Sequence, residues 1–475
     1  MAADLQAHIA TLIAELDTET PHGPVLLPSA GFYTGIFAWD SAWHYFFLKE
    51  VDAPRARQEL ETLFATADAD GRVPHETRFA GAERHGPLRR FQMALLGNTY
   101  APDGRSRFID PPVYAWAAAD ALRAGSPAPG DPAANRQLFH AAVGSLTALR
   151  RQRSLPALPY PYSELPVILH PLESGTDGSP QFDEIYGGRA GTLRAMVGLG
   201  RKLARLDWQP ARALAAGVPV IFDVTVISFY LLGLLELRSV ADAAEAPEAA
   251  ETGTAASADL PDRDEILALV RAFLAEFWNP DAGIFTSRRL EGPTETPVEA
   301  ARIRRCRTGT MSGLLPLLFP LSEHAASGRP ASAPPPSLWP EDVPAPGELL
   351  QRHGCGGTFW EDYLPRYTAP PGGAEGRGGA AGWGGRERLS RLLWRGPCSW
   401  MNMNYLLWRL LQGYGRAGEA AELATRAGEV FTRLGPYEYF HADGSRGGGA
   451  LPFSWNGLLL AMTPRPEDPA LPGHA

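Results

Sequence analysis

The chain of 475 residues contains few lysines and few cysteines. Lys49 and Lys202 are its lysines, so arginine supplies nearly all of the 44 basic residues, and the net charge is −9. A surface that binds nucleic acid needs clustered positive charge, so this balance argues against a nucleic-acid partner. The cysteines Cys306, Cys355 and Cys398 match neither a disulfide framework nor a metal-binding spacing, and we expect three reduced thiols.

The sequence also lacks signals for export and for membrane insertion. Its first residues include acids where a signal peptide needs a basic segment, and no apolar core follows them. The longest apolar stretch, residues 218–237, is interrupted by Asp223 and ends in charged residues, which is typical of a buried helix. These absences predict a cytoplasmic protein with no membrane partner.

Apolar residues recur at helical spacing along most of the chain, and strand-like alternation is scarce. The predicted helices cover residues 5–16, 39–48, 57–65, 113–123, 138–150, 191–206, 224–240, 263–277, 312–321, 403–414, 417–434 and 453–462. Long connections rich in glycine and proline separate them. This pattern predicts a helical scaffold that carries its function on the loops.

Three low-complexity segments interrupt this pattern and are expected to be mobile insertions. They cover residues 243–257, 327–346 and 370–385. The third resembles a flexible linker but contains Trp383, which is either a lid residue that packs on a ligand or an exposed loop residue. None is flanked by an obvious independent domain, so we expect residues 1–475 to form a single domain.

The densest group of polar residues is the segment 170–183, which contains Glu173, Asp177 and Asp183. Carboxylates crowded into one loop repel one another, and this repulsion raises the pKa of one of them. A raised pKa is what a general acid needs near neutral pH. The alternative interpretation is a solvated surface loop.

Two further segments place a carboxylate among aromatic residues. Residues 31–43 hold five aromatics beside Asp40, which suits a sugar site; alternatively Asp40 or Ser41 is the N-cap of a helix. Glu438 is flanked by tyrosines, so it is either a functional carboxylate with a shifted pKa or the partner of a nearby arginine. The histidines form no metal-binding pair at helical spacing, and His75 is interpreted as structural.

Seven segments, in this order, resemble glycoside hydrolase family 63, and especially the bacterial mannosylglycerate and glucosylglycerate hydrolases. They read GFYTGIFAWDS, GRVPHE, PPVYAWAA, HPLESGTDGSPQFD, WRGPCSWMNMNY, YEYFHADG and FSWNGLLL. The most specific is ESGTDGSP. The resemblance implies an all-α fold, an (α/α)6 barrel or six-hairpin toroid, with long Gly/Pro-rich loops at the mouth of the site. It also implies an inverting α-glycosidase without a metal or an organic cofactor.

The resemblance assigns roles to individual residues. Asp177 matches the family's general acid and Glu438 its general base, and inversion needs two such carboxyls roughly 6.5–9.5 Å apart with a water between them. The residues expected to bind substrate are Tyr33, Trp39, Asp40, Asp110, Glu173, Trp394, Arg395 and Trp455.

One departure from the family pattern concerns the substrate. Relatives that act on glycerate compounds usually have Ser-Gln before two prolines, where this chain has Ile109 and Asp110. If that glutamine contacts glycerate, an anionic Asp110 repels the glycerate carboxylate unless an arginine intervenes. Arginines close by in the sequence are Arg89, Arg90, Arg105 and Arg107.

The expected activity is therefore hydrolysis of a small α-glucoside or α-mannoside of the glucosylglycerate or mannosylglycerate kind. The expected partner is a small-molecule glycoside, and the sequence leaves a homo-oligomer open. The alternatives are a glycosidase for a natural-product glycoside and a non-catalytic barrel that binds sugars. Another helical-barrel enzyme, such as a terpene cyclase or an epimerase, is disfavoured because the chain lacks an Asp-rich metal-binding run and paired histidines.

Overall fold

The computed structural model describes most of the chain. The described residues are 2–79, 99–123, 132–186, 193–245, 260–291, 302–327, 331, 334–354, 394, 398–441 and 443–463. The described part is mostly helical, and each of the twelve predicted helices has a counterpart in it. The predicted linker 370–385 with Trp383, the thiol of Cys355 and residues 246–257 lie outside the described residues.

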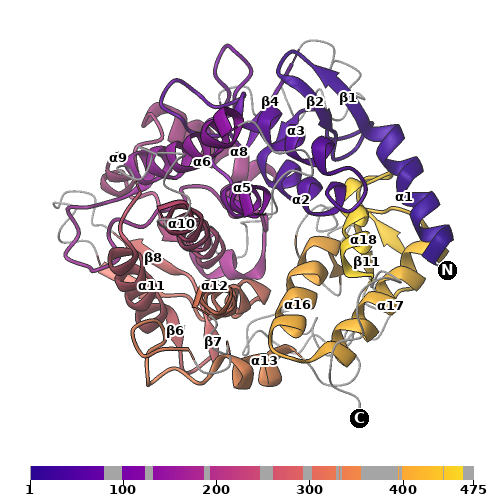
Figure 1. The fold of residues 1–475 in the computed structure, drawn as a ribbon. Helices are drawn as coiled ribbons and strands as arrows, with labels where there is room; N and C mark the ends of the chain where they lie inside the picture. Colours follow the sequence, from indigo (N-terminus) through magenta and orange to yellow (C-terminus); the bar gives the residue numbers. More distant parts are fainter. Residues whose placement is uncertain are drawn as a thin grey trace, which may run out of the picture.

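An inner ring of helices surrounds the centre of the molecule (Figure 1). Its members are α2 (Ala38–Leu48), α5 (Val113–Arg123), α10 (Val224–Glu245), α12 (Leu318–Ser327), α16 (Met401–Gly413) and α18 (Leu458–Met462). Neighbours in this order contact one another, with the 3-10 helix η7 (Met311–Leu317) linking α12 to α16, and α18 returns to α2. The contact between α18 and α2 thus closes the ring.

An outer set of helices packs against this ring. They are α1 (Ala2–Leu16), α3 (Ala53–Phe64), α6 (Pro132–Arg153), α11 (Arg263–Phe277), α13 (Pro346–Gly354) and α17 (Ala417–Leu434). The composition of a helix matches the set to which it belongs. Every residue of the inner helix α2 is buried, whereas the outer helix α3 has a buried apolar stripe flanked by Arg and Glu residues. Helices of the two sets alternate along the described chain except between α6 and α10, where α7 (Asp183–Tyr186), α8 (Leu193–Arg205) and α9 (Pro210–Ala215) belong to neither set.

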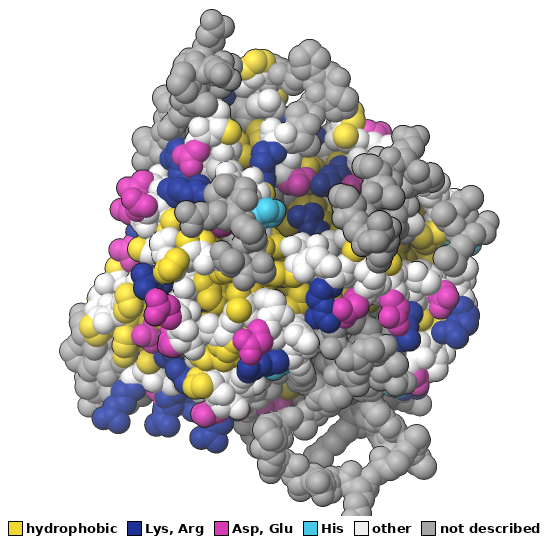
Figure 2. Space-filling model, turned by 60° about the horizontal axis from the view of Figure 1, so that its bottom comes forward, with side chains coloured by type: hydrophobic (Ala, Val, Ile, Leu, Met, Phe, Trp, Pro, Cys, Tyr) yellow, Lys and Arg dark blue, Asp and Glu magenta, His cyan; other side chains and the backbone are white. Residues whose placement is uncertain are grey.

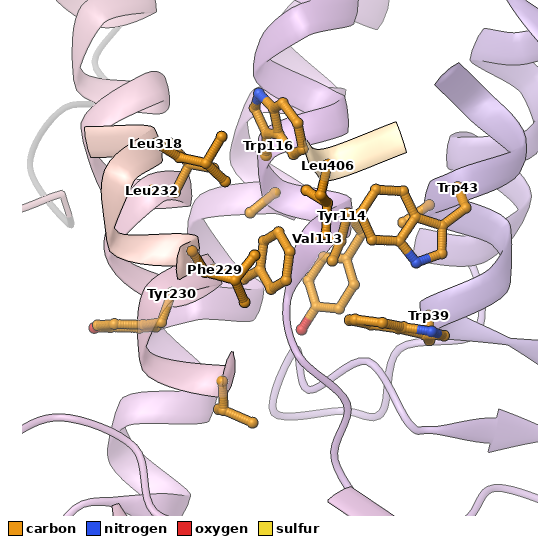
Figure 3. Packing of buried hydrophobic residues seen from close by; sticks show 14 of the residues in the cluster. Trp39, Trp43, Val113, Tyr114, Trp116, Phe229, Tyr230, Leu232, Leu318 and Leu406 are labelled. Atoms are coloured by element: carbon orange, nitrogen blue, oxygen red, sulfur yellow. The ribbon is translucent and has the colours of Figure 1, made fainter. Parts of the chain in front are cut away.

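Aromatic side chains from the inner helices fill the centre of the ring (Figure 3). Trp39 and Trp43 of α2 meet Phe229 of α10 edge-on, with ring centroids 5.8 and 5.9 Å apart. Phe229 in turn stacks on Trp116 of α5 at 6.4 Å. Trp39 lies at one end of this packed column, so the column supports the part of α2 that carries the candidate site.

A polar cluster, buried except for part of Arg55, joins the first and last parts of the ring. His44 of α2 contacts Glu59 of α3 through Nδ1 at 2.9 Å. Through Nε2 it contacts Ser454 of the 3-10 helix η9 (Ser454–Gly457) at 2.6 Å. Arg55 adds a 2.9 Å bond to the second oxygen of Glu59. Because these side chains satisfy one another, the cluster holds α2, α3 and η9 together without leaving a buried charge unpaired.

The all-α expectation is correct for most of the chain, but it missed small antiparallel sheets. In the described residues, two-stranded sheets pair β1 (Asp17–Thr20) with β2 (Gly23–Leu26), β3 (Ile36–Phe37) with β4 (Glu76–Thr77), and β6 (Trp278–Asn279) with β7 (Ile284–Phe285). One three-stranded sheet contains β5 (Val220–Phe222), β8 (Arg288–Glu291) and β9 (Arg302–Arg305). A second contains β10 (Cys398–Ser399), β11 (Tyr439–His441) and β12 (Gly447–Gly448). Strands of two to four residues are too short to show a repeat of period two.

Two of these sheets place the ends of loops beside the inner helices. Phe37 pairs with Glu76, which brings His75 next to the start of α2. Ser399 pairs with Phe440, which brings the segment before α16 next to Glu438. The sheets therefore assemble residues that are far apart in the sequence.

Part of the second predicted insertion is packed against the core. Leu338, Trp339 and Val343 are buried, and the indole N–H of Trp339 donates to the carbonyl of Pro344 at 3.1 Å. Trp339 also meets Phe285 edge-on at 5.9 Å. The expectation of a mobile segment is wrong here, because apolar side chains between the prolines anchor it.

The apolar stretch around residue 230 forms a buried helix, as predicted. Val224–Ala244 is long and apolar enough to cross a membrane, but 89% of its most apolar window is buried inside the protein. On the face drawn in Figure 2, acidic and basic side chains are interspersed around exposed hydrophobic ones. Basic side chains therefore do not merge into one continuous surface on that face.

Candidate active site

Asp177 lies on a tight loop between two 3-10 helices, η2 (Pro171–Ser174) and η3 (Pro180–Phe182). Its carbonyl accepts a 3.0 Å bond from the backbone N–H of Trp394. This bond ties the loop to a segment more than two hundred residues further along the chain.

Glu173 anchors the same loop from within. Its carboxylate accepts bonds from Arg153 Nη2 at 2.6 Å and from the backbone N–H groups of Ile109 at 3.2 Å, Leu169 at 2.7 Å and His170 at 3.2 Å. Glu173 has no exposed surface. Glu173 was expected to contact substrate; with four protein donors on a fully buried carboxylate, we assign it instead to holding the loop that carries Asp177.

Glu438 lies in the turn between α17 and β11. Its Oε2 accepts a 2.8 Å bond from the backbone N–H of Ala450, and its Oε1 accepts a 3.3 Å bond from the hydroxyl of Tyr33. The pairing of Tyr439 with Gly448 brings Ala450 to this position. The carboxylate is thus fixed from both oxygens by parts of the chain at opposite ends of the sequence.

The environment raises the pKa of both partly buried carboxyls. Burial raises the pKa of Asp177 to about 7; the cation of His75 opposes this, and the charges of Asp110 and Glu438 add to it. Burial raises the pKa of Glu438 to about 7 as well, partly offset by the N–H of Ala450 and the hydroxyl of Tyr33. The charge of Glu438 acts on Asp177, so the two carboxylates belong to one site, and each can gain or lose a proton near neutral pH.

Asp40 lies in the first turn of α2 and is 7% exposed. Burial raises the pKa of Asp40 well above the usual range, and the charge of Asp110 raises it further. The nearby indole N–H of Trp455 lowers this pKa, although the indole and the carboxylate are not in hydrogen-bond geometry. The proposed N-cap role is wrong, because Phe37 occupies the N-cap position and no side chain caps the helix.

Three buried polar atoms beside these carboxylates have no hydrogen-bond partner among the described residues: Oδ1 of Asp40 and Nε1 of Trp39 and of Trp455. Each residue is at least nine-tenths buried. Leaving such groups unpaired is costly, and the indole of Trp455 lies close enough to act on the carboxyl of Asp40, so these two residues are candidate contacts for a polar ligand.

Asp110 is 1% exposed and faces protein donors on both sides. Its Oδ2 accepts a 3.0 Å bond from the backbone N–H of Trp39, and its Oδ1 lies 2.6 Å from Nδ1 of His75. These contacts hold the start of α2 against the loop of His75. A direct contact between Asp110 and substrate stays a prediction.

A series of aromatic rings in contact with one another connects the surroundings of Asp177 to those of Glu438. Trp394 stacks on Trp400 with centroids 4.3 Å apart and lies 5.9 Å from Trp455. Phe453 bridges Trp455 at 4.8 Å and Tyr33 at 5.6 Å. This series of rings runs from the backbone partner of Asp177 to the hydroxyl partner of Glu438.

The structure therefore brings most of the predicted site residues together. These are Tyr33, Trp39, Asp40, Asp110, Asp177, Trp394, Glu438 and Trp455. Arg395 lies outside the described residues. His75, which the sequence suggested to be structural, contacts the site residue Asp110 at 2.6 Å; its place in the quoted GRVPHE segment was the available signal.

No cluster of three or more metal-ligating side chains occurs within the part of the chain that the structure describes. The site as described consists of carboxylates, one histidine and aromatic rings. Such a set suits acid–base chemistry on a sugar.

The chain is similar to known proteins over most of its length. The family model of the mannosylglycerate hydrolase MGH1-like glycoside hydrolase domain matches residues 33–456. A mannosylglycerate hydrolase from Thermus thermophilus is 25% identical over 93% of this chain and 97% of its own length. The mannosylglycerate hydrolase MGH2 of Selaginella moellendorffii is 26% identical over 38% of this chain and 36% of its own length, and MGH1 of the same plant is matched over 32% of its length. The chain thus matches about a third of these two plant relatives.

The fold is also that of a solved structure. The crystal structure of a family 63 mannosylglycerate hydrolase from Thermus thermophilus, in complex with Tris and D-glycerate, superposes with a TM-score of 0.68. The match covers 96% of this chain and 99% of that chain, at 20% identity. The two chains thus share a fold. The chain belongs to the MGH1-like glycoside hydrolase family, which confirms the resemblance seen in the sequence.

Proposed function

We propose that this protein is an inverting α-glycosidase that hydrolyses a small α-mannoside or α-glucoside of the mannosylglycerate kind. Asp177 is its general acid and Glu438 its general base. The observation that carries the proposal is the pair of recessed carboxyls, Asp177 and Glu438, each with a pKa raised to about 7 and coupled within one site.

In this mechanism Asp177 is protonated when substrate binds and gives its proton to the glycosidic oxygen as the bond to the anomeric carbon breaks. Glu438 is ionised and accepts a proton from a water molecule, whose oxygen bonds to the same carbon from the opposite face. The products are the free aglycone alcohol and a sugar of inverted anomeric configuration. Ala450 and Tyr33 hold the carboxylate of Glu438 in place for this step.

The sugar ring is proposed to lie between Trp39, Asp40 and Trp455. The unpaired Oδ1 of Asp40 accepts a hydrogen bond from a sugar hydroxyl, and the two indole N–H groups donate to sugar oxygens. The alternation of inner and outer helices supports the proposal of an (α/α)6 barrel. The residues named here lie at the N-terminal ends of inner helices or on adjoining loops, so the site would occupy one end of the barrel.

An acidic aglycone such as glycerate is compatible with Asp110. The sequence alone suggested that this carboxylate repels a glycerate carboxylate. Asp110 is almost fully buried and paired with His75, so the imidazole offsets part of the repulsion between Asp110 and an anionic ligand. Together with the matched mannosylglycerate hydrolases, this favours a glycosylglycerate over other small glycosides.

The test is a proton NMR screen for hydrolysis by the purified protein. The panel contains mannosylglycerate, glucosylglycerate, kojibiose, nigerose, trehalose and aryl α-glycosides, with Asp177→Asn and Glu438→Gln as inactive controls. Release of the β-anomer from mannosylglycerate or glucosylglycerate supports the proposal, whereas release of the α-anomer overturns the inverting mechanism. A folded protein that hydrolyses nothing overturns the enzyme proposal and favours the sugar-binding alternative.

The sugar site is tested separately by calorimetry. Asp40→Ala is expected to weaken the binding of the released sugar about tenfold or more, because a buried acceptor for a sugar hydroxyl is lost. An unchanged affinity removes Asp40 from the site.

A further inference from the structure

The peptide group that precedes Glu438 is held at both of its polar atoms. Its N–H, which belongs to Glu438, donates to the carbonyl of Ala450 at 3.0 Å. Its C=O, which belongs to Tyr437, accepts a bond from Nδ2 of Asn456 at 2.9 Å. Because a peptide group is planar, bonds at both atoms fix its orientation and, with it, the position of the Cα atom of Glu438.

Asn456 makes a second bond of the same kind. Its Nδ2 also donates to the carbonyl of Phe453 at 2.9 Å, and its Oδ1 has no partner among the described residues. The described polar contacts of this side chain are therefore donations to main-chain carbonyls. Asn456 is 1% exposed, so bulk water does not compete for either bond.

Further bonds join the same two stretches of chain. The backbone N–H of Phe453 donates to the carbonyl of Pro436 at 2.8 Å. The N–H of Ala450 donates to Oε2 of Glu438, also at 2.8 Å. Residues 450–456 thus hold both the main chain and the carboxylate of the proposed general base.

The segment 450–456 is itself anchored to the helix that carries the proposed sugar contacts. The hydroxyl of Ser454 lies 2.6 Å from Nε2 of His44 on α2. Trp455, a candidate contact for a polar ligand, stands between Ser454 and Asn456 in the 3-10 helix η9. One short segment therefore carries a candidate sugar contact and the support of the base.

We propose that Asn456 is a positioning residue for the general base: by bonding to the carbonyl of Tyr437, it fixes the place from which the main chain presents the carboxylate of Glu438. Loss of the amide frees the peptide group before Glu438 and leaves the side chain of Trp455 in the chain. The chemical step is therefore impaired more than sugar binding. The role in catalysis rests on the proposed function, whereas the effect of Asn456 on the position of Glu438 can be measured without substrate.

The test compares Asn456→Leu with Asn279→Leu. Asn279 is a matched control, since it is 3% exposed and its Nδ2 also donates to a backbone carbonyl, that of Cys306 at 3.2 Å. It lies in β6, which is well separated from β11 and α18 in Figure 1.

The first measurement is steady-state hydrolysis. In Asn456→Leu kcat should fall about tenfold or more with KM within about threefold of the wild-type value, because a displaced base slows the attack of water. Asn279→Leu should keep the wild-type kcat. An unchanged kcat in Asn456→Leu overturns the proposal, and so does an equal loss in the control.

The second measurement is nitrogen-15 NMR of the Ala450 amide. This amide donates to the carboxylate of Glu438, and such a bond is stronger when the carboxyl is ionised, so its chemical shift should change as Glu438 titrates. The change should disappear in Glu438→Gln, which assigns it. In Asn456→Leu it should fall to about half or less, whereas Asn279→Leu should leave it unchanged. A wild-type titration in Asn456→Leu overturns the proposal even if kcat falls.

The two measurements separate this inference from the proposed function. A protein that hydrolyses nothing in the screen overturns the proposed function, and the Ala450 titration then decides the role of Asn456. If Asn456→Leu does not fold, Asn456→Ala takes its place, because it removes the same two bonds without adding apolar bulk. Wild-type kcat and a wild-type Ala450 titration in Asn456→Ala would overturn the proposal.

Discussion

Replacing Gly449 by alanine is expected to displace the proposed general base without unfolding the protein. Gly449 has φ +80°, and a Cβ built on it would lie 2.4 Å from Oε2 of Glu438. Ordinary contact at such a position begins at 3.4 Å, so the carboxylate or the strand must move by about 1 Å. A displacement of about 1 Å in a catalytic group costs on the order of a hundredfold in rate. We therefore expect kcat/KM to fall about a hundredfold, which corresponds to about 2.7 kcal/mol.

The cost of the strained backbone is separated from the cost of displacement by a second glycine. Gly415 has φ +75°, and a Cβ there would meet nothing within 4 Å. Alanine at either position costs about 1–2 kcal/mol of unfolding free energy, because a side chain in the left-handed region clashes with its own backbone. Gly415→Ala should show this loss with full activity, whereas Gly449→Ala should show it with the rate loss added.

The assay combines urea unfolding of both variants with steady-state hydrolysis of the substrate that the NMR screen identifies. Full activity in Gly449→Ala would refute the prediction that hydrolysis requires the carboxylate of Glu438 at its present position. An equal loss of activity in both variants would show that backbone strain, and not displacement of the carboxylate, is responsible.

Three other perturbations test separate parts of the site. Hydrolysis needs Glu438 ionised and Asp177 protonated, so activity should rise with pH through the pKa of Glu438 and fall through the pKa of Asp177. With both pKa values near 7, the kcat/KM profile should peak near pH 7. A peak below about pH 5 would contradict the raised pKa values. Glu173→Gln leaves Arg153 buried without a counter-charge and should lower the unfolding free energy by about 3–5 kcal/mol, measured by urea unfolding. A loss below about 1 kcal/mol would mean that the ion pair of Glu173 and Arg153 does not anchor the loop. Tyr33→Phe removes a donor that lowers the pKa of Glu438, so the acidic limb of the profile should move to higher pH, and an unmoved limb would place the hydroxyl elsewhere.

The helices were predictable because their signal is local. Apolar residues three and four apart identify a buried face whatever the helix packs against, and the predicted helices 113–123 and 417–434 coincide with α5 and α17. The short sheets carried no comparable signal. Pairs such as Phe37 with Glu76 depend on where two loops meet, and a strand of two residues has no periodicity to read.

The carboxylates of the site also differ in how far local sequence could predict their roles. Asp177 and Glu438 could be proposed from the sequence, because the ESGTD and YEYF segments are specific and each crowds an acid among polar or aromatic neighbours. Glu173 belongs to the same ESGTD segment and has the same chemistry, yet it meets Arg153 and three backbone N–H groups and has no free surface. The N–H groups of Leu169 and His170 are local partners, but Arg153 and Ile109 come from other parts of the chain, and the sequence could not show that together they fully occupy the carboxylate.

The sequence by itself determined the helical scaffold, the family and the two carboxylates proposed for catalysis, since spacing and specific motifs are properties of neighbouring residues. Only the tertiary structure decided which acids are paired and which remain open to a ligand. Asp110 and Asp40 were both expected to contact substrate, but the fold places His75 and the N–H of Trp39 on the first and leaves an oxygen of the second without a partner among the described residues. The state of a buried charge depends on partners that the folded chain brings from a distance, and these contacts are not encoded in the residues beside it.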